Sequence, residues 1–324
     1  MNGMVHNPAY SLPSLDDIKA AQARLHDVAY ATPVLPINPA ESRTLHLFAK
    51  CENLQRTGSF KIRGAFNRLA QLSLAQRARG VVAYSSGNHA QGVACAAALL
   101  GVPATIVMPE NAVPAKLEAT RRFGAEVIFA GTDSETRRKA AEELAAERGA
   151  ALAPPYDHPA IIAGQGTIGL EILEQLPNVD TIIVPIGGGG LIAGIALAVK
   201  LVRPNVRIIG AEPAGAADAG ASLRAGRIVE LEQVETIADG LRARRVGALP
   251  FESIRANVSD IVSIPDSAIL EATRMLLTEY HLVAEPSGAV AVAAALGNTG
   301  YGRTVAIISG GNIDAQLLQR LVAA

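Results

Sequence analysis

The chain has 324 residues, of which 49% are hydrophobic, and this suits a soluble α/β enzyme of two modest domains that share a cleft. A net charge of −1 without a basic stripe argues against a nucleic-acid partner, and the absence of any apolar run of about 18 residues excludes a membrane-spanning helix. The two cysteines lack CxxC spacing and the N-terminus lacks a signal-peptide pattern, so we expect a cytoplasmic protein.

The first half of the chain alternates between helical and strand patterns. A capping pattern at Ser14 predicts a helix to about residue 24, and alternation predicts a strand over 45–51. A helical pattern then runs from Ser59 to about Leu72. Beyond it, strands are predicted at 80–84, 104–108 and 125–129, with helices at 88–100, 114–123 and 134–147. This spacing predicts right-handed crossovers and a parallel sheet.

A second alternating set begins at Pro159, with helices at 159–175 and 191–202 and strands at 181–185 and 207–211. Residues 214–258 are rich in Gly and Ala and give no clear pattern. Two helices, at 266–280 and from 287, a strand at 304–309 and a helix from 313 follow. We expect the helix through Lys61 to pack with this half. The larger domain is then discontinuous, covering 1–75 and 157–324, around a small domain of 76–156.

Lys61 lies at the start of a predicted helix, among small residues and next to Phe60. A solvated surface lysine is the simplest interpretation. However, the positive end of the helix dipole is an unfavourable place for a cation. A partly desolvated amine near positive potential loses its proton more easily and can form a Schiff base. The position therefore favours a nucleophilic lysine.

Four consecutive glycines, residues 187–190, follow an apolar strand and precede a helix. Their backbone N–H groups and the helix N-terminus are typical of a phosphate-binding loop, whereas the alternative is a tight, closely packed turn. The loop lacks the G-x-x-x-x-G-K-[ST] pattern of nucleotide triphosphate sites. Gly187, Gly189 and Gly194 also miss the spacing of a dinucleotide site.

Two other turns stand where a strand ends. The segment Ser85, Ser86, Gly87, Asn88, His89 leads into a helix, and its exposed amides suit a carboxylate, although a capping serine is the alternative. The segment Ser309, Gly310, Gly311, Asn312 ends the last strand and on its own would be an ordinary Gly-Gly turn.

Taken together and in this order, Lys61 and these loops resemble the pyridoxal-phosphate enzymes of the tryptophan synthase β-subunit fold, fold type II. The nearest match is the threonine/serine dehydratase and serine racemase group, and the resemblance covers about residue 14 to the end. It implies two domains, each with a mainly parallel, open twisted sheet flanked by helices, and an active site in the interdomain cleft. It also implies pyridoxal 5′-phosphate as cofactor and a homodimer or homotetramer.

The resemblance assigns roles to individual residues. Lys61 would form the Schiff base and act as general base, Asn88 would bind the ring hydroxyl, and Ser309 would face the pyridine nitrogen. The cofactor contacts it implies are Phe60, Lys61, Asn88, Gly187, Gly188, Gly189, Gly190 and Ser309. The substrate contacts it implies are Ser85, Ser86, Gly87, Asn88, His89 and Arg137.

Three of these positions bear on the subfamily. Ser86 stands where racemase-type members carry serine and many dedicated threonine dehydratases carry alanine, so it is a second candidate catalytic residue. Arg137 aligns with an arginine near the substrate of serine racemases, although a solvated helix arginine is an equal alternative. Tyr156 departs from the asparagine that racemases carry there, whereas dehydratase-type members often have an aromatic residue at this position. The balance between dehydratase and racemase therefore stays open.

Glu212 and Asp218 follow a predicted strand and are six residues apart around Pro213. Two acids on such a loop are more often only turn residues. By resemblance, they and the backbone carbonyl of Ala216 form a divalent cation site, and oxygen ligands suit Mg²⁺ or Ca²⁺.

The predicted function is a pyridoxal-phosphate-dependent dehydratase, or ammonia-lyase. It would convert L-threonine, L-serine or 3-hydroxyaspartate to a 2-oxo acid and ammonia by α,β-elimination, with serine racemase as the alternative activity. A nucleotide-dependent oxidoreductase and an inactive binding protein on the same fold are the alternatives of other classes. Because the chain ends at Ala324, we expect no C-terminal regulatory domain and no feedback inhibition by isoleucine.

Overall fold

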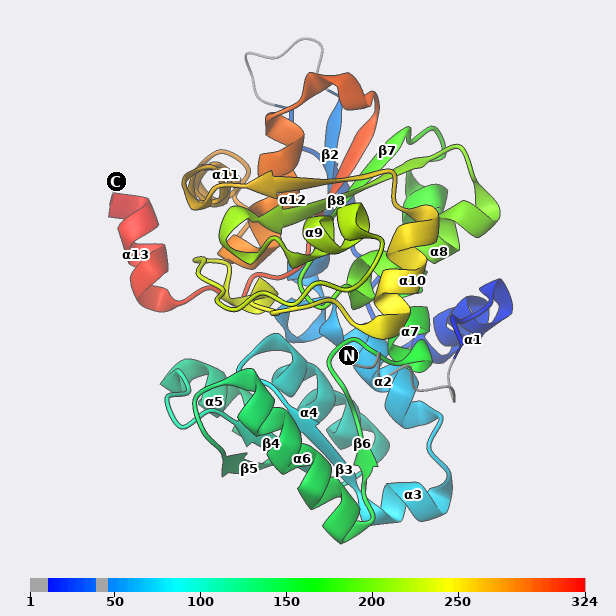
Figure 1. The fold of residues 1–324 in the computed structure, drawn as a ribbon, viewed down its shortest axis with the longest axis vertical. Helices are drawn as coiled ribbons and strands as arrows, with labels where there is room; N and C mark the ends of the chain where they lie inside the picture. Colours follow the sequence, from blue (N-terminus) through cyan, green and yellow to red (C-terminus); the bar gives the residue numbers. More distant parts are fainter. Residues whose placement is uncertain (1–10, 39–45, 324) are drawn as a thin grey trace.

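The computed structural model describes residues 11–38 and 46–323, in which the strands form two sheets (Figure 1). The large sheet has six strands in the order β1-β2-β10-β7-β8-β9, and the small sheet has four in the order β5-β4-β3-β6. All pairs are parallel except β1 with β2. The predicted α/β class with mainly parallel sheets is confirmed.

The bounds of the strands follow the apolar runs. The large sheet consists of β1 (Val34–Pro36), β2 (Leu47–Cys51), β7 (Thr181–Pro185), β8 (Arg207–Pro213), β9 (Asp260–Ile264) and β10 (Thr304–Ile308). The small sheet consists of β3 (Val81–Tyr84), β4 (Ala104–Met108), β5 (Glu126–Phe129) and β6 (Ala151–Leu152).

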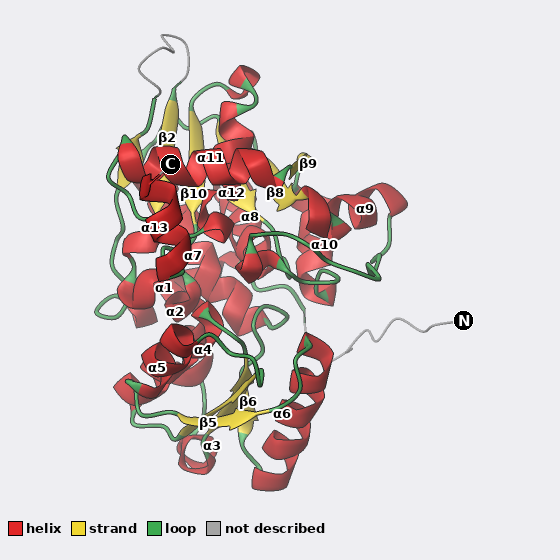
Figure 2. Ribbon diagram, turned by 90° about the vertical axis from the view of Figure 1, so that its left-hand side faces the viewer, coloured by secondary structure: helices red, strands yellow, loops and turns green. Residues whose placement is uncertain are grey.

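Helices flank both sheets (Figure 2). Those around the large sheet are α1 (Leu15–Leu25), α2 (Lys61–Ala70), α7 (Pro159–Gln175), α8 (Gly190–Val202), α9 (Asp218–Ala225), α10 (Ala248–Asn257), α11 (Asp266–Thr278), α12 (Pro286–Leu296) and α13 (Ala315–Ala323). Those around the small sheet are α3 (Leu74–Arg79), α4 (Asn88–Leu100), α5 (Pro114–Arg121) and α6 (Ser134–Arg148). Short 3-10 turns lie at η1 (Glu52–Leu54), η2 (Arg56–Gly58), η3 (Ala214–Ala216), η4 (Asp239–Leu241) and η5 (Thr299–Tyr301).

The large sheet is buried on both faces because its strands alternate between two apolar layers. Ile183 and Ile209 pack with α11 and α12, whereas Ile182 and Ile208 pack with α7, α8 and α10. Every residue of β7 and β10 is buried, as expected for central parallel strands covered by helices on both sides. This rigid layer carries the turns that end β7 and β10.

The helix that begins at Lys61 lies where the two sheets meet. It packs against α4, from the small-sheet region, and α7, from the large-sheet region. The crossing with α7 is close, because a Cβ added at Gly164 would lie 2.6 Å from the Cα of Gly64. The preceding residue is held to the large sheet, since the Phe60 N–H donates to the Ser309 carbonyl at 3.2 Å. The sequence thus ties Lys61 to both regions.

The structure differs from the sequence predictions mainly between residues 214 and 258. This stretch contains η3, α9, η4 and α10, where the pattern predicted no elements. The short elements β1, β6 and α3, and the edge strand β9, were also not predicted, because they are too short or too exposed to show periodicity. The predicted start of the strand at residue 45 lies outside the described residues. No described helix is long and apolar enough to cross a membrane.

Candidate active site

A cavity of about 600 Å³ lies between the two sheets. The small-sheet side contributes the β3–α4 turn, α5 and α6, and the large-sheet side contributes the start of α2, the β7–α8 turn, η4 and the end of β10. All residues with a predicted cofactor or substrate contact line it: Phe60, Lys61, Ser85, Ser86, Gly87, Asn88, His89, Arg137, Gly187, Gly188, Gly189, Gly190 and Ser309. The fold thus brings five separate segments to one space.

Lys61 is the first residue of α2, and its amine points to the cavity wall. Its Nζ donates to the Pro155 carbonyl at 3.0 Å and lies 5.1 Å from the centre of the Phe60 ring. Burial lowers the pKa of the Lys61 amine to about 8, although the negative charge of Glu285 acts in the opposite direction. A larger share of the amine is therefore uncharged at neutral pH, as a nucleophile or base requires.

The four-glycine loop connects β7 to α8 and has the backbone of an anion-binding loop. Gly189 has φ +88°, which favours glycine. Among the described residues, the N–H groups of Gly187, Gly188 and Gly189 find no hydrogen-bond acceptor. The ring of Tyr156 packs directly on Gly188, so a side chain at that position would clash. Free amides at the N-terminus of a 13-residue helix fit the phosphate of pyridoxal phosphate.

The β3–α4 turn offers a second set of amides. The N–H groups of Ser86, Asn88 and His89 donate to no acceptor within the described residues, and α4 begins at Asn88. His89 Nε2 lies 2.9 Å from the Ala153 carbonyl, so this nitrogen carries the hydrogen. Burial, and then the charge of Lys61, lowers the pKa of His89 to about 3. The imidazole is therefore neutral at pH 7 and adds no positive charge to the turn, whose free N–H groups remain available to a carboxylate.

Asn88 is oriented by two hydrogen bonds. Its Nδ2 donates to Glu285 Oε1 at 2.5 Å, and its Oδ1 accepts from Asn312 Nδ2 at 2.8 Å. Burial, and then the charge of Asp239, raises the pKa of Glu285 to about 7. Nearby, the Ser309 hydroxyl donates to the Ser287 carbonyl at 3.4 Å. These side chains form the wall next to Lys61.

Arg137 and Tyr156 both line the cavity. Arg137 is partly buried and donates to the Thr132 carbonyl at 2.9 Å, while its Nε has no partner among the described residues. Burial raises the pKa of the Tyr156 hydroxyl to about 12. Both side chains line the cavity, so either can contact a ligand there.

The predicted cation ligands lie outside the residues that line this cavity. Contrary to prediction, Glu212 and Asp218 do not share a loop, since Glu212 lies in β8 and Asp218 is the first residue of α9. The Glu212 carboxylate accepts from the N–H groups of Ala219 and Gly220, each at 3.0 Å, and Oδ2 of Asp218 is buried and has no partner in the described part of the chain. Ala216 lies in η3, between the two acids in the sequence, and is also buried.

Burial raises the pKa of both carboxyl groups to about 7, and the charge of Glu212 adds to the effect at Asp218. Two neighbouring buried acids of this kind fit either protons or a cation with oxygen ligands. The described residues contain no group of three or more His, Cys, Asp or Glu side chains that could hold a metal ion. A cation here would need backbone or water oxygens as well.

Several charged residues of the cavity wall were not singled out from the sequence, among them Lys116, Asp239 and Glu285. Glu285 is the N-cap of α12 and precedes Pro286, so its sequence context indicates an ordinary helix start. Lys116 lies on α5 and Asp239 on η4, and the two form an ion pair across the cavity. No local pattern relates residues 123 positions apart.

The family model described as "Pyridoxal-phosphate dependent enzyme" matches residues 26–310. The chain belongs to the family of pyridoxal-phosphate-dependent enzymes. It is 45% identical to the L-threonine ammonia-lyase of Thermotoga maritima, over 95% of this chain and 78% of that protein. It is 44% identical to the L-threo-3-hydroxyaspartate ammonia-lyase of a Pseudomonas species, over 94% of this chain and 97% of that protein.

Among solved structures, maize serine racemase matches with a TM-score of 0.92 and 42% identity, over 97% of this chain and 98% of that one. Membership of the pyridoxal-phosphate-dependent family confirms the predicted family and the predicted fold. It also sets aside the nucleotide-dependent oxidoreductase, which belongs to another class. Some of these relatives are named as lyases and others as racemases. The comparisons therefore do not decide between elimination and racemisation, and the residues of the site must do so.

Proposed function

We propose that the protein is an ammonia-lyase that converts a small β-hydroxy amino acid to a 2-oxo acid and ammonia. The candidate substrates are L-threonine, L-serine and L-threo-3-hydroxyaspartate. One observation carries the proposal: the low-pKa amine of Lys61 faces a cavity that also presents two loops of free amides. Relatives named as ammonia-lyases, 44–45% identical over nearly the whole chain, support it.

Each part of the site has a task in this reaction. Pyridoxal phosphate, when bound, supplies an electron-withdrawing ring that makes the α-hydrogen of the amino acid acidic. Lys61 would hold it covalently, residues 187–190 would bind its phosphate, and Asn88 and Ser309 would contact its ring. The amides of residues 85–89 would bind the substrate carboxylate. The Lys61 amine would then take the α-proton, and the β-hydroxyl would leave as water.

The released enamine would hydrolyse to the 2-oxo acid and ammonia. Exclusion of water from the cavity until that point would prevent side reactions, and we propose that substrate closes the cleft between the two regions. In this proposal the regions are the domains expected from the sequence, 1–75 with 157–324 and 76–156. The β3–α4 turn, residues 85–89, would then move toward Lys61 on closure, and we call it the carboxylate turn.

Racemisation is a second candidate because of Ser86. This serine is exposed on the β3–α4 turn and lines the cavity, and the serine racemase of maize has a similar fold. Racemisation needs an acid on the face of the substrate opposite Lys61, and a serine hydroxyl in a hydrogen-bonded site could return a proton there. Tyr156, which is typical of dehydratase-type members, favours elimination as the main activity.

A cation site is a further part of the proposal. We propose that Glu212, Asp218 and the Ala216 carbonyl bind Mg²⁺ or Ca²⁺, because the buried Oδ2 of Asp218 has no partner among the described residues. A homodimer or homotetramer and a cytoplasmic location stay predictions from the sequence.

A substrate panel tests the proposed function. Holoenzyme is incubated with L-serine, L-threonine and L-threo-3-hydroxyaspartate, and both the 2-oxo acid and the D-isomer are measured. We expect 2-oxo acid from at least one substrate at a rate that exceeds any D-isomer formation. D-isomer as the main product would reverse the order of the two candidates, and no product from any substrate would reject both.

A further inference from the structure

The cavity contains a lysine whose position suits a second substrate carboxylate. Lys116 extends from α5, on the small-sheet side, and its side chain is only 15% exposed. Its ammonium pairs with Asp239 of η4, on the large-sheet side. Both residues line the cavity, so the ion pair spans the space that a substrate would enter.

Lys116 also lies against the proposed carboxylate turn. A Cβ built at Gly87 would be 3.5 Å from Cδ of Lys116 and 3.7 Å from its Nζ. A substrate whose α-carboxylate sits on the amides of this turn would therefore bring its neighbouring groups close to the ammonium. A carboxylate is the group that the ammonium would bind most strongly, whereas a hydroxyl or methyl would gain little from it.

We propose that Lys116 is a specificity-determining residue that binds the β-carboxylate of a dicarboxylic β-hydroxy amino acid such as L-threo-3-hydroxyaspartate. This inference rests on the proposed function, because it names the substrate class of the same site. The incoming carboxylate takes the place of the Asp239 carboxylate, so one ion pair is exchanged for another. A monocarboxylic substrate such as L-serine leaves the Lys116–Asp239 pair in place.

The exchange is feasible because Asp239 is the more exposed partner. Its side chain is 39% exposed, so the released carboxylate is hydrated again, whereas Lys116 stays inside the wall. Asp239 also faces another acid, since its charge contributes to the raised pKa of Glu285. Asp239 is thus a competitor of the second substrate carboxylate, and the two residues have opposite effects on dicarboxylate binding.

Five arginines also line the cavity: Arg137, Arg138, Arg242, Arg244 and Arg245. Arg138 pairs with Glu135 and Glu142, Arg242 donates to the Thr236 carbonyl, and Arg244 and Arg245 pair with Glu230. Arg137 is the one predicted from the sequence to contact the substrate. Its hydrogen bond goes to Thr132 in the segment just before its own helix, and no contact joins it to the carboxylate turn among the described residues. Lys116 touches that turn and pairs across the cavity. The geometry therefore favours Lys116 over Arg137 as the residue that discriminates between one and two carboxylates.

Two variants with opposite expected effects test the proposal. Lys116→Met removes the charge and keeps the length of the side chain, and Asp239→Asn removes the competing charge and keeps the shape. Lys139→Met, an exposed lysine of α6 outside the cavity lining, is the matched control. For each holoenzyme, kcat/KM is measured with L-threo-3-hydroxyaspartate and with L-serine. Calorimetry with L-aspartate and L-alanine, which lack a β-hydroxyl, gives a binding ratio that needs no elimination.

The ratio of interest is kcat/KM with L-threo-3-hydroxyaspartate divided by kcat/KM with L-serine. We expect Lys116→Met to lower this ratio by about tenfold or more, and Asp239→Asn to raise it by about threefold. The aspartate-to-alanine affinity ratio should change in the same directions, and Lys139→Met should change neither. A ratio unchanged in Lys116→Met, or lowered in Asp239→Asn, would overturn the inference. If no amino acid yields a 2-oxo acid, the proposed function fails, and the calorimetric ratios alone decide the role of Lys116.

Discussion

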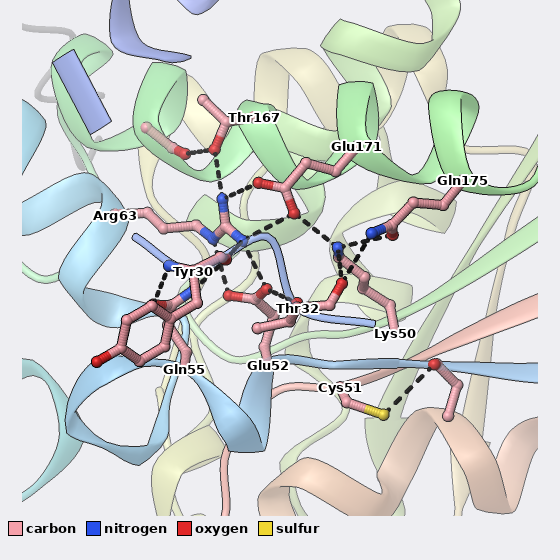
Figure 3. Close-up of polar contacts among 12 residues, drawn as sticks. Tyr30, Thr32, Lys50, Cys51, Glu52, Gln55, Arg63, Thr167, Glu171 and Gln175 are labelled. Atoms are coloured by element: carbon pink, nitrogen blue, oxygen red, sulfur yellow. Dashed lines mark hydrogen bonds and ion pairs between the residues drawn. The ribbon is translucent and has the colours of Figure 1, made fainter. Parts of the chain in front are cut away.

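Lys50, which is fully buried, and Lys61, which is partly buried, are eleven residues apart and differ in what surrounds them. Lys50, on β2, donates to the Thr32 carbonyl at 2.6 Å, Glu171 at 2.6 Å and Gln175 at 3.0 Å (Figure 3). Lys61 donates to the Pro155 carbonyl, and the nearby carboxyl of Glu285 has a pKa of about 7. Burial lowers the pKa of both amines, and nearby carboxylates oppose this effect at each: Glu171 and Glu52 at Lys50, and Glu285 at Lys61. Burial alone therefore does not make a reactive lysine, and the number of partners matters as much.

The partners of Lys50 belong to a charge-balanced network centred on Arg63, which lies two residues after Lys61 (Figure 3). The Arg63 guanidinium binds Glu52 through Nε and Nη2, both at 2.8 Å, and Glu171 through Nη1 at 2.5 Å. Burial would raise the pKa of Glu52, but the charge and hydrogen bonds of Arg63 hold it below its usual range. The network fixes the start of α2 to α7, and thereby the direction of the Lys61 side chain.

The largest expected effect comes from Lys61. Lys61→Ala removes the proposed Schiff-base partner and base, so 2-oxo acid formation should fall by about 10⁴-fold or more. The fold should persist, because the Arg63 network does not include Lys61. Steady-state assays and circular dichroism measure both properties. Residual turnover within about tenfold of the wild type would show that another group serves as base.

Substitution of Lys50 should lower the stability of the fold, whereas substitution of Lys61 should lower the activity. Lys50→Met leaves Glu171 with Arg63 alone and is expected to cost about 3 kcal/mol of unfolding free energy, near the lower end for a broken buried ion pair. Lys139→Met, which removes an exposed ion pair, should cost less than about 0.5 kcal/mol. Urea denaturation compares the variants. Equal stabilities of the two variants would mean that the network carries no net stability.

Much of the fold could be predicted from the sequence, because long apolar runs identify the central strands and helices. The bounds of β4, β7, α4 and α7 agree with the predicted ones. Residues 214–258 could not be predicted, since α9 and α10 are short and packed by distant partners. Gly215, for example, is fixed by Glu235, whose carbonyl leaves no space for a Cβ. Such long-range packing leaves no periodic pattern.

In the candidate site, the turns could be predicted from the sequence, but charged residues of the cavity wall such as Glu285, Lys116 and Asp239 could not. Lys61, the glycines and residues 85–89 stand at ends of elements, where local sequence indicates their position. Glu285 and the Lys116–Asp239 pair depend on how the two regions meet. The Arg63 network has the same origin, because its acids come from η1 and α7, more than a hundred residues apart.

Glu212 and Asp218 extend the comparison to buried acids that have no basic partner within hydrogen-bond reach among residues 11–38 and 46–323. Their pKa values of about 7 lie above those of the unfolded chain, so the stability they contribute is present at low pH and is lost as pH rises through 7. In the proposed cation site, a divalent cation would replace the protons above that pH. Adding Mg²⁺ or Ca²⁺ after EDTA treatment should therefore raise Tm more at pH 8 than at pH 6. At saturation, the free energy of unfolding should rise by up to about a few kcal/mol. No shift at either pH would indicate that the acids bind only protons.

The smallest expected effect is a change in the ratio of D-isomer to 2-oxo acid, caused by substitution of Ser86. Ser86→Ala should abolish D-isomer formation and keep most of the 2-oxo acid rate with the L-substrate, because only racemisation needs a second acid. Chiral chromatography separates the products. Equal loss of both activities would indicate damage to the carboxylate turn, and a wild type without D-isomer would leave Ser86 a turn residue.

The comparison of the two lysines can be tested most directly by reduction of the holoenzyme with labelled borohydride, followed by peptide mapping. If Lys61 is the reactive amine, the cofactor and the hydride label will be found on the peptide that contains Lys61, and the Lys50 amine will be unmodified. Label on Lys50, or no lysine labelled in a protein that binds pyridoxal phosphate, would contradict the account.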